Sequence, residues 1–302
     1  MHIKDVVKKA RQMETVIPAF NISHLPMLKA VAQAIVDEDS VAMIQVARLE
    51  WEKFQSKSLE AVAQEYAKYA KPNYTFLHLD HVPVIDEDEL PVDYMPIMER
   101  AIKAGYQSVM IDGSRLSLEE NIASTREVSD FAHEIGVAVE AELGSVVGHE
   151  KDGIGISYEE LFRSKKGFTD IQEAKRFVEE SACDWLSVAV GSIHGAIAEK
   201  TKNQKKPEAL LDIPHIEALE NATGGLPLVL HGGSGINQEY ILKGIKSGIA
   251  KINVATEIRQ AYELALEDRA DDIEYARQKV YERTRWVISD FLKTKGNYRK
   301  LF

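Results

Sequence analysis

The chain has 302 residues, 45% of them hydrophobic, which is enough to bury two ordinary cores or one large α/β barrel. A formal net charge of −11 and the lack of any apolar run near the roughly 20 residues of a membrane span predict neither a nucleic-acid partner nor a membrane partner. The single cysteine, Cys183, excludes an internal disulfide, and the N-terminus shows no secretion signal, so we predict a cytoplasmic protein.

Short runs typical of strands alternate with helical stretches along the chain, which is the pattern of repeated βα units. The expected strands are, in chain order, Ile17–Phe20, Val41–Val46, Tyr74–Leu79, Ser108–Ile111, Ala138–Glu142, Trp185–Val190, Leu228–Leu230 and Ala250–Asn253. Between them the periodicity predicts helices such as Leu59–Tyr69, Leu118–Ile135, Ile171–Ser181 and Tyr240–Ser247. Eight such units predict a TIM (β/α)8 barrel in one domain, residues 1–302, with a C-terminal helical extension from about residue 257.

Two long polar segments, 144–168 and 195–211, interrupt this rhythm after strands five and six. Loops of this length are usually functional, and both follow strands, so we expect them at the carboxyl face of the barrel, where TIM-barrel sites lie. The second segment carries a basic run, which is more typical of a solvated loop than of a ligand site: Lys200, Lys202, Lys205 and Lys206.

Six consecutive strands, the third to the eighth, end in or lead into polar or ionisable residues. They are Asp80 and His81, Asp112, Glu142, His194, His231 and Asn253. Since the carboxyl ends of parallel strands meet at one face of a barrel, we expect these side chains to converge there.

Three of these residues are histidines: His81, His194 and His231. Three imidazoles around one point, with a position left open, form a ligand set for catalytic zinc. Asp112 and Glu142 add carboxylates that would either hold a second or alternate metal or orient the histidines. His78 is assigned to packing or to a hydrogen bond behind the ligands.

A phosphate site is predicted after strands seven and eight. Gly232, Gly233 and Ser234 follow strand seven, and Asn253 leads through Thr256 into a helix. Glycines let backbone N–H groups approach an oxyanion, and a helix N-terminus favours negative charge. These loops are where TIM barrels often bind phosphate.

The chain resembles the class II fructose-bisphosphate aldolase family, which includes the tagatose-bisphosphate aldolases. The motifs run in order from about Pro18 to Thr256. They are AFN (19–21), HLDH (78–81), SVMIDGS (108–114), VEAELG (139–144), GSIHG (191–195), LVLHGGSG (228–235) and KINVAT (251–256).

The resemblance implies a metal-dependent lyase that cleaves a phosphorylated ketose such as fructose 1,6-bisphosphate to dihydroxyacetone phosphate and an aldehyde. It implies His81, His194 and His231 as zinc ligands, Asp112 and Glu142 at a second metal position, and Asp80 as the catalytic carboxylate. It also implies Glu150 as the proton donor of a mobile loop. Residues expected around the substrate and its phosphate are Asn21, Gly195, Gly232, Gly233, Ser234, Asn253 and Thr256. A monovalent cation and a homodimer or homotetramer are further expectations.

The sequence departs from the family where the far end of the substrate would lie. A glycine usually follows the DH pair, but here Val82 and the acidic insertion IDEDELPVD follow it. The turn after strand two, often serine-containing, reads Val46-Ala47-Arg48-Leu49-Glu50, and the usual Asp-Pro-Arg stretch near the carboxyl terminus is replaced by residues 271–275. We therefore weigh an alternative substrate, a ketose 1-phosphate with a different distal anion. Arg48 would either bind that anion by a bidentate fork or be a surface arginine.

Two other functions would fit parts of this pattern. A zinc hydrolase on the same barrel would use similar ligands, but it leaves the phosphate loops and the DH pair without a role. A non-catalytic sugar-phosphate-binding protein would be expected to lack a ligand or the catalytic carboxylate, and none is missing from the sequence.

Overall fold

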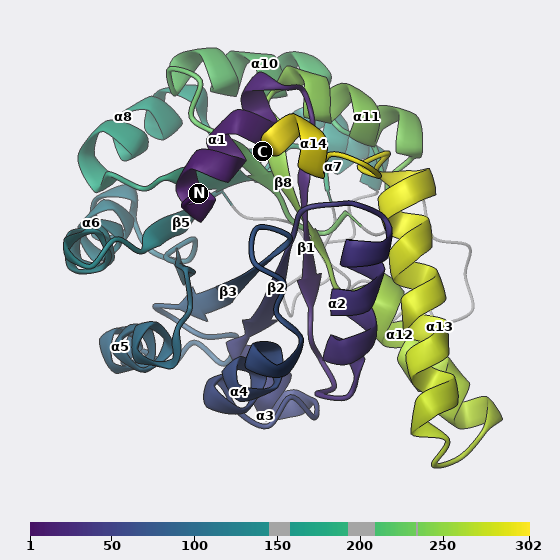
Figure 1. The fold of residues 1–302 in the computed structure, drawn as a ribbon. Coiled ribbons are helices and arrows are strands. Elements are labelled where there is room, and N and C mark those ends of the chain that lie inside the picture. The colour runs from purple at the N-terminus through teal and green to yellow at the C-terminus, as the bar shows by residue number, and fades with distance from the viewer. Residues whose placement is uncertain (145–157, 193–208, 234) are drawn as a thin grey trace.

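The computed structural model describes residues 1–144, 158–192, 209–233 and 235–302. Eight parallel strands close into a barrel in the order β1 to β8, as the TIM-barrel prediction requires (Figure 1). All eight expected strands are present, with bounds that differ from the predicted ones by a few residues. They are β1 Ile17–Asn21, β2 Ala42–Ala47, β3 Thr75–Pro83, β4 Ser108–Asp112, β5 Ala138–Leu143, β6 Trp185–Val188, β7 Leu228–Leu230 and β8 Ile249–Val254.

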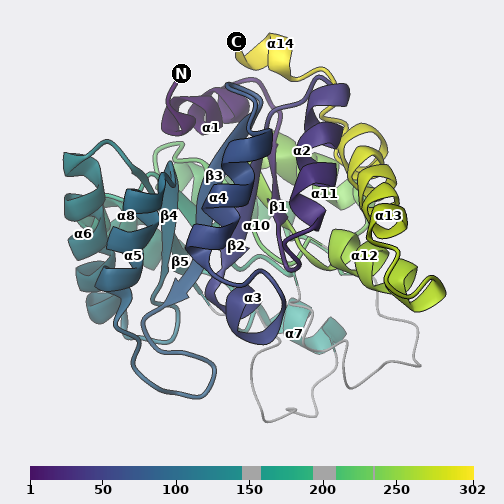
Figure 2. The same ribbon diagram turned by 60° about the horizontal axis from the view of Figure 1, so that its bottom comes forward.

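Helices follow the strands along the chain and most of them cover the outside of the barrel, whereas the short helices α3 and α7 lie at one end of it (Figures 1 and 2). They are α2 Met27–Asp37, α3 Arg48–Lys53, α4 Leu59–Tyr69, α5 Tyr94–Ala104, α6 Leu118–Glu134, α7 Tyr158–Ser164, α8 Ile171–Ser181, α10 Ile213–Ala222 and α11 Gln238–Ser247. The helices predicted at 59–69 and 171–181 are confirmed at the same bounds.

One part of the expected loop 144–168 is helical instead, so that prediction was wrong for α7. The helix is short and is fixed by tertiary contacts. The Tyr158 hydroxyl donates to the carbonyl of Gly191 (3.1 Å) and accepts from the backbone N–H of Leu210 (2.6 Å). Both partners lie far away in sequence, so local periodicity did not reveal them.

The amino end of the barrel is closed by α1 (Ile3–Gln12) and α14 (Tyr298–Leu301), which lie together at that end (Figure 2). The buried face of α1 consists of Ile3, Val6, Val7 and Ala10, spaced as one side of a helix. These residues join an apolar cluster inside the barrel with Met43, Phe76, Trp185 and Leu301, among others. The opposite end, where α3 and α7 lie, is therefore the end at which polar side chains gather.

The C-terminal helices begin with α12 (Thr256–Asp268), which follows β8 as the other helices follow their strands. Helix α13 (Ile273–Trp286) packs against α12 and α2 (Figure 1). It runs into a π-helical segment, η1 (Val287–Phe291). Within the described ranges, no helix combines the length and apolar composition that a bilayer crossing requires.

Candidate active site

Three strands each carry a pair of buried polar side chains two residues apart. Alternate residues of a strand point to the same face, so each pair gives one deep side chain and one nearer the carboxyl end. The pairs are His78 and Asp80 on β3, Glu140 and Glu142 on β5, and Lys251 and Asn253 on β8, all buried. The outer members are residues predicted at the site, and the deep members lie directly beneath them.

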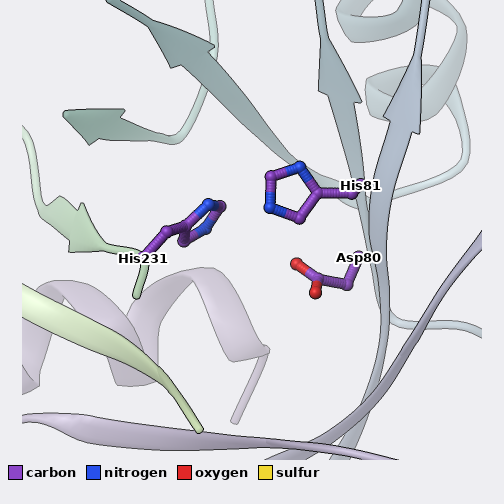
Figure 3. A group of neighbouring side chains, drawn as sticks. All are labelled: Asp80, His81 and His231. Carbon is purple, nitrogen blue, oxygen red and sulfur yellow. The ribbon is translucent and has the colours of Figure 1, made fainter. Parts of the chain in front are cut away.

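The end of β3 carries two adjacent functional side chains, Asp80 and His81. Ordinary alternation would point them to opposite faces. However, β3 pairs with β4 through Leu79–Val109 and then Val82–Ile111, so β3 contains one extra residue across this step. His81 lies at this bulge with a positive φ of 31°, a backbone conformation that is uncommon for a non-glycine residue. The bulge brings the imidazole and the Asp80 carboxylate to the same side of the strand (Figure 3).

The Asp80 carboxylate is held by two side-chain amides. Asn21 Nδ2 donates to Oδ2 at 2.8 Å, and Asn253 Nδ2 donates to Oδ1 at 2.9 Å. Burial raises the pKa of Asp80, but attraction to His81, Lys251 and His231 more than offsets this and keeps the pKa below its ordinary value. Asp80 is thus an ionised, oriented carboxylate that can accept a proton. Asn21 and Asn253 were predicted around the substrate, and the structure brings both side chains to Asp80.

His81 and His231 face each other across the end of the barrel, with ring centroids 4.5 Å apart (Figure 3). Ligand atoms of Asp80, His81 and His231 lie within 4.8 Å of one another, and so do those of His81, Asp112 and Glu142. Glu142 Oε2 lies 3.2 Å from His231 Nδ1 and 3.7 Å from His81 Nδ1. Two imidazoles and three carboxylates in so small a volume suit a divalent metal.

The charge balance at His81 agrees with a cation site. Burial lowers the pKa of this imidazole, but Asp80, Asp112 and Glu142 more than offset that effect and raise it to about 10. His81 Nδ1–H donates to Asp112 Oδ2 at 3.2 Å, and the pKa of Asp112 is lowered in spite of its burial. The carboxylates therefore attract positive charge to this point. The third predicted ligand, His194, lies outside the described residues.

The deep side chain of Glu140 forms a buried hub that our sequence analysis missed. Its Oε1 accepts from His231 Nε2–H at 2.9 Å, and its Oε2 accepts from Trp185 Nε1–H at 2.6 Å. Lys251 Nζ lies 2.8 Å from the same Oε2 and also donates to Asn253 Oδ1 at 2.7 Å. The charge of Lys251 and the hydrogen bond from His231 lower the pKa of Glu140 well below its ordinary value, although burial raises it.

This hub fixes the ring of His231, because a carboxylate that accepts from one imidazole nitrogen sets which nitrogen is left to bind a metal. The alternation E-A-E in VEAEL and K-I-N in KINV was the available signal for Glu140 and Lys251. His78 lies on the same buried layer, 2.8 Å from Ser108 Oγ through Nδ1 and 3.4 Å from Glu140 through Nε2. Burial lowers the pKa of His78 to about 3, so it is neutral, in keeping with the prediction of packing or of a hydrogen bond behind the ligands.

Replacing Glu140 with glutamine is expected to weaken binding of zinc by about 10–100-fold, because His231 loses a charged acceptor. Competition with a chromophoric chelator measures the affinity. Glu38→Gln removes another buried carboxylate, one that pairs with Lys295 at 3.0 Å far from this site, and is expected to leave zinc affinity unchanged. Equal zinc affinities for wild type and Glu140→Gln would contradict the assignment.

The predicted phosphate loops are only partly described. Gly232 has a φ of +67°, a conformation that favours glycine. A Cβ at Gly233 would lie 3.0 Å from Ile252 Cγ2, so the backbone passes close to β8 there. Thr256 is the first residue of α12, whose N-terminus opens at this end of the barrel. Ser234, Gly195 and Glu150 lie outside the described residues, as does the basic run from Lys200 to Lys206.

Arg48 begins α3, directly after the strand that pairs with β3 through Ala47 and Asp80. Its Nε lies 2.9 Å from Glu52, and its Nη1 lies 3.5 Å from Asp86 in the insertion after β3. Asp86 in turn accepts from the backbone N–H groups of Asp88 and Leu90. An ion pair therefore links the arginine to the insertion noted in the sequence.

Comparison with known proteins gives consistent matches over nearly the whole chain. A family model described as fructose-bisphosphate aldolase class-II matches residues 1–297. Two proteins named 6-phospho-5-dehydro-2-deoxy-D-gluconate aldolase, from Bacillus velezensis and Bacillus subtilis, are each 37% identical over 267 residues, which cover 86% of this chain and 81% of theirs. The crystal structure of the YdjI aldolase from Escherichia coli K12 is similar with a TM-score of 0.77 at 28% identity, covering 98% of both chains. The chain therefore belongs to the class II fructose-bisphosphate aldolase family and is a lyase.

Proposed function

We propose that the chain uses zinc to cleave a ketose 1-phosphate reversibly into dihydroxyacetone phosphate and an aldehyde. The family is metal-dependent, typically with zinc. The observation that carries the proposal is the Asp80 carboxylate, held by two amides and facing His81 and His231. This arrangement combines a metal site with a proton acceptor, which retro-aldol chemistry needs together.

In this proposal His81, His194 and His231 would hold the zinc, which would supply a Lewis acid for the ketone oxygen; His194 lies outside the described residues. Asp80 accepts the proton of the substrate hydroxyl two carbons from the ketone carbon. That oxygen becomes the aldehyde oxygen, and the electrons of the broken carbon–carbon bond pass to the phosphate-bearing fragment. Glu150 then returns a proton to this fragment, completing dihydroxyacetone phosphate. In the reverse direction Asp80 gives its proton to the aldehyde oxygen.

The remaining predicted site residues have supporting roles in this proposal. Asp112 and Glu142 would hold a second divalent metal or orient the histidines. Their contacts with His81 and His231 are compatible with either role. The glycines and Ser234 after β7, Gly195 and the start of α12 at Thr256 would bind the phosphate, with a monovalent cation beside it.

We further propose that the far end of the substrate carries a carboxylate instead of a second phosphate. The name 6-phospho-5-dehydro-2-deoxy-D-gluconate, carried by the two Bacillus relatives, describes a ketone beside a phosphorylated carbon and a carboxylate at the other end. Arg48 is the proposed distal ligand. Its two acidic neighbours, Glu52 and Asp86, more than offset its positive charge, which disfavours a dianionic phosphate here more strongly than a singly charged carboxylate.

A substrate panel with and without chelator tests both parts of the proposal. We expect a 6-phospho-5-dehydro-2-deoxy-hexonate to be cleaved with a higher kcat/KM than fructose or tagatose bisphosphate. Arg48→Leu is expected to lower kcat/KM for the carboxylate substrate by about 10–100-fold, mainly through KM, because a charge-assisted hydrogen bond is lost. A bisphosphate as the best substrate, with no effect of Arg48→Leu, would contradict the distal assignment and leave the aldolase assignment intact.

The cellular location and assembly also stay predictions. Cys183 is buried, and burial raises the pKa of its thiol to about 12. The thiol is therefore unreactive at neutral pH, which fits a reducing cytoplasm. A homodimer or homotetramer is expected, and light scattering of the purified protein would distinguish them.

A further inference from the structure

A buried carboxylate, Glu50, lies behind the catalytic group and is not used by the mechanism above. It is the third residue of α3, and only 6% of its surface is exposed. Its Oε2 accepts from the backbone N–H of Ala47 at 2.7 Å and from Asn21 Nδ2 at 3.3 Å, and its Oε1 accepts from Ser23 Oγ at 2.9 Å. One of these three donors, Asn21, also donates to Asp80.

The amide of Asn21 therefore bridges two carboxylates. Its Nδ2 carries two hydrogens, one directed to Asp80 and one to Glu50. Its Oδ1 accepts from Gln45 Nε2 at 2.8 Å, so the nitrogen must face the acids. With Gln45 on one side and Glu50 on the other, the amide has one orientation that satisfies every partner.

Capping α3 does not account for the placement of Glu50. Accepting from the backbone of the residue before the helix is one half of a capping box, and an exposed glutamate would do this equally well. Instead the carboxylate is buried near Asp80, and burial together with repulsion by Asp80 raises its pKa to about 7 in spite of three hydrogen bonds. Burying one acid beside a second acid costs stability. This cost indicates that Glu50 has a role other than capping the helix.

We propose that Glu50 is a positioning residue for catalysis, which locks the Asn21 amide and through it the Asp80 carboxylate. This inference rests on the proposed aldolase function. Helix α3 would then act at both ends of the substrate. Arg48, at the start of the helix, is the proposed distal ligand, and Glu50, two residues later, anchors the catalytic carboxylate through Asn21.

Two substitutions separate hydrogen bonding from mere packing. Glu50→Leu fills the space but removes every acceptor, and we expect kcat to fall by about 10–100-fold with KM changed less than about threefold, since small misplacements of a catalytic group have effects of this size. Glu50→Gln keeps an oxygen for Ala47 and Asn21 and an amide that can donate to Ser23, so its kcat should stay within about threefold of wild type. A role only in holding α3 would alter KM through Arg48 and leave kcat unchanged.

A double-mutant cycle tests the route. In an Asn21→Ala background, Glu50→Leu is expected to have no further effect on kcat, because the residue through which it acts is gone. If the two substitutions lowered kcat by independent factors that multiply, the proposal would be contradicted. An unchanged kcat in Glu50→Leu would also contradict it, and so would a Glu50→Gln variant with a kcat as low as that of Glu50→Leu. Glu38→Leu controls for the loss of a buried carboxylate and should keep wild-type kcat whatever its Tm. Zinc content should be equal in all variants.

A crystal structure of Glu50→Leu gives a readout that needs no activity. We expect the Asn21 nitrogen to move out of hydrogen-bonding distance of Asp80, and an unmoved amide would overturn the inference. If Glu50→Leu does not fold, Glu50→Asp, which is one methylene shorter and cannot reach both Ala47 and Asn21, replaces it in both measurements. Failure of zinc-loaded wild type to cleave any ketose phosphate would instead refute the proposed function, with the crystallographic test still standing.

Discussion

Replacing Asp80 with asparagine is expected to lower kcat for ketose-phosphate cleavage by about 10²–10⁴-fold, the range for losing a positioned general base. The carboxylate accepts from Asn21 and Asn253, one on each oxygen. An amide at this position has no comparable basicity, and its nitrogen would face one of these donors. The affinity for dihydroxyacetone phosphate should change little, because the proposed phosphate-binding residues follow β7 and β8 and do not include Asp80. Steady-state kinetics and product inhibition measure the two quantities.

Asp184→Asn is the matched control for this variant. Asp184 is also buried, and it accepts from the backbone N–H of Val139 at 2.7 Å and from His133 at 2.9 Å. It precedes β6 and so lies at the opposite, amino end of the barrel. We expect this variant to lose stability but to keep kcat within about threefold of wild type. An Asp80→Asn enzyme with more than a tenth of wild-type kcat would show that another group accepts the proton.

Removing the metal is expected to abolish cleavage and to lower Tm by roughly 10 °C, both reversibly. A ligand present at about 1,000 times its Kd stabilises the fold by about 4 kcal/mol, and each kcal/mol shifts Tm by a few degrees in a chain of this size. Without a metal, Asp112 and Glu142 lie close to each other and to His81, and their negative charges repel each other without a divalent cation between them. Calorimetry and activity before and after chelation, and again after addition of zinc, provide the test.

The alternative mechanism is an aldol cleavage through a Schiff base between the substrate and a lysine. Lys251 is the lysine to consider, because it lies inside the barrel. Its Nζ is buried in the barrel next to Glu140 and Asn253, in a structural role that leaves it paired. Borohydride added with substrate should therefore not inactivate the enzyme. Full cleavage activity in protein shown by elemental analysis to be metal-free, together with borohydride trapping, would overturn the metal-dependent mechanism.

Much of the fold and the outline of the site could be predicted from the sequence because both follow from local pattern. Eight strand-like runs separated by helical stretches leave the parallel barrel as the simplest arrangement, and all eight strands are confirmed. Parallel strands bring their carboxyl ends to one face whatever the side-chain packing. The convergence of Asp80, His81, Asp112, Glu142 and His231 at one place was therefore predictable from strand ends alone.

The tertiary structure determined the hydrogen-bond partners of these side chains. Asn21 and Asn253 were predicted around the substrate, and that stays a prediction; the structure adds that their amides hold Asp80, because β1, β3 and β8 bring them within 3 Å of it. The sequence did not reveal the roles of Glu140 and Glu50, because the partners that define them, His231 for Glu140 and Asn21 for Glu50, lie on or directly after strands elsewhere in the barrel. The bulge at His81 and the tyrosine that anchors α7 depend in the same way on a register and a contact between separate elements. Local periodicity determines which face a residue occupies, whereas hydrogen-bond partners depend on the stagger of the closed barrel, which no single segment of the chain encodes.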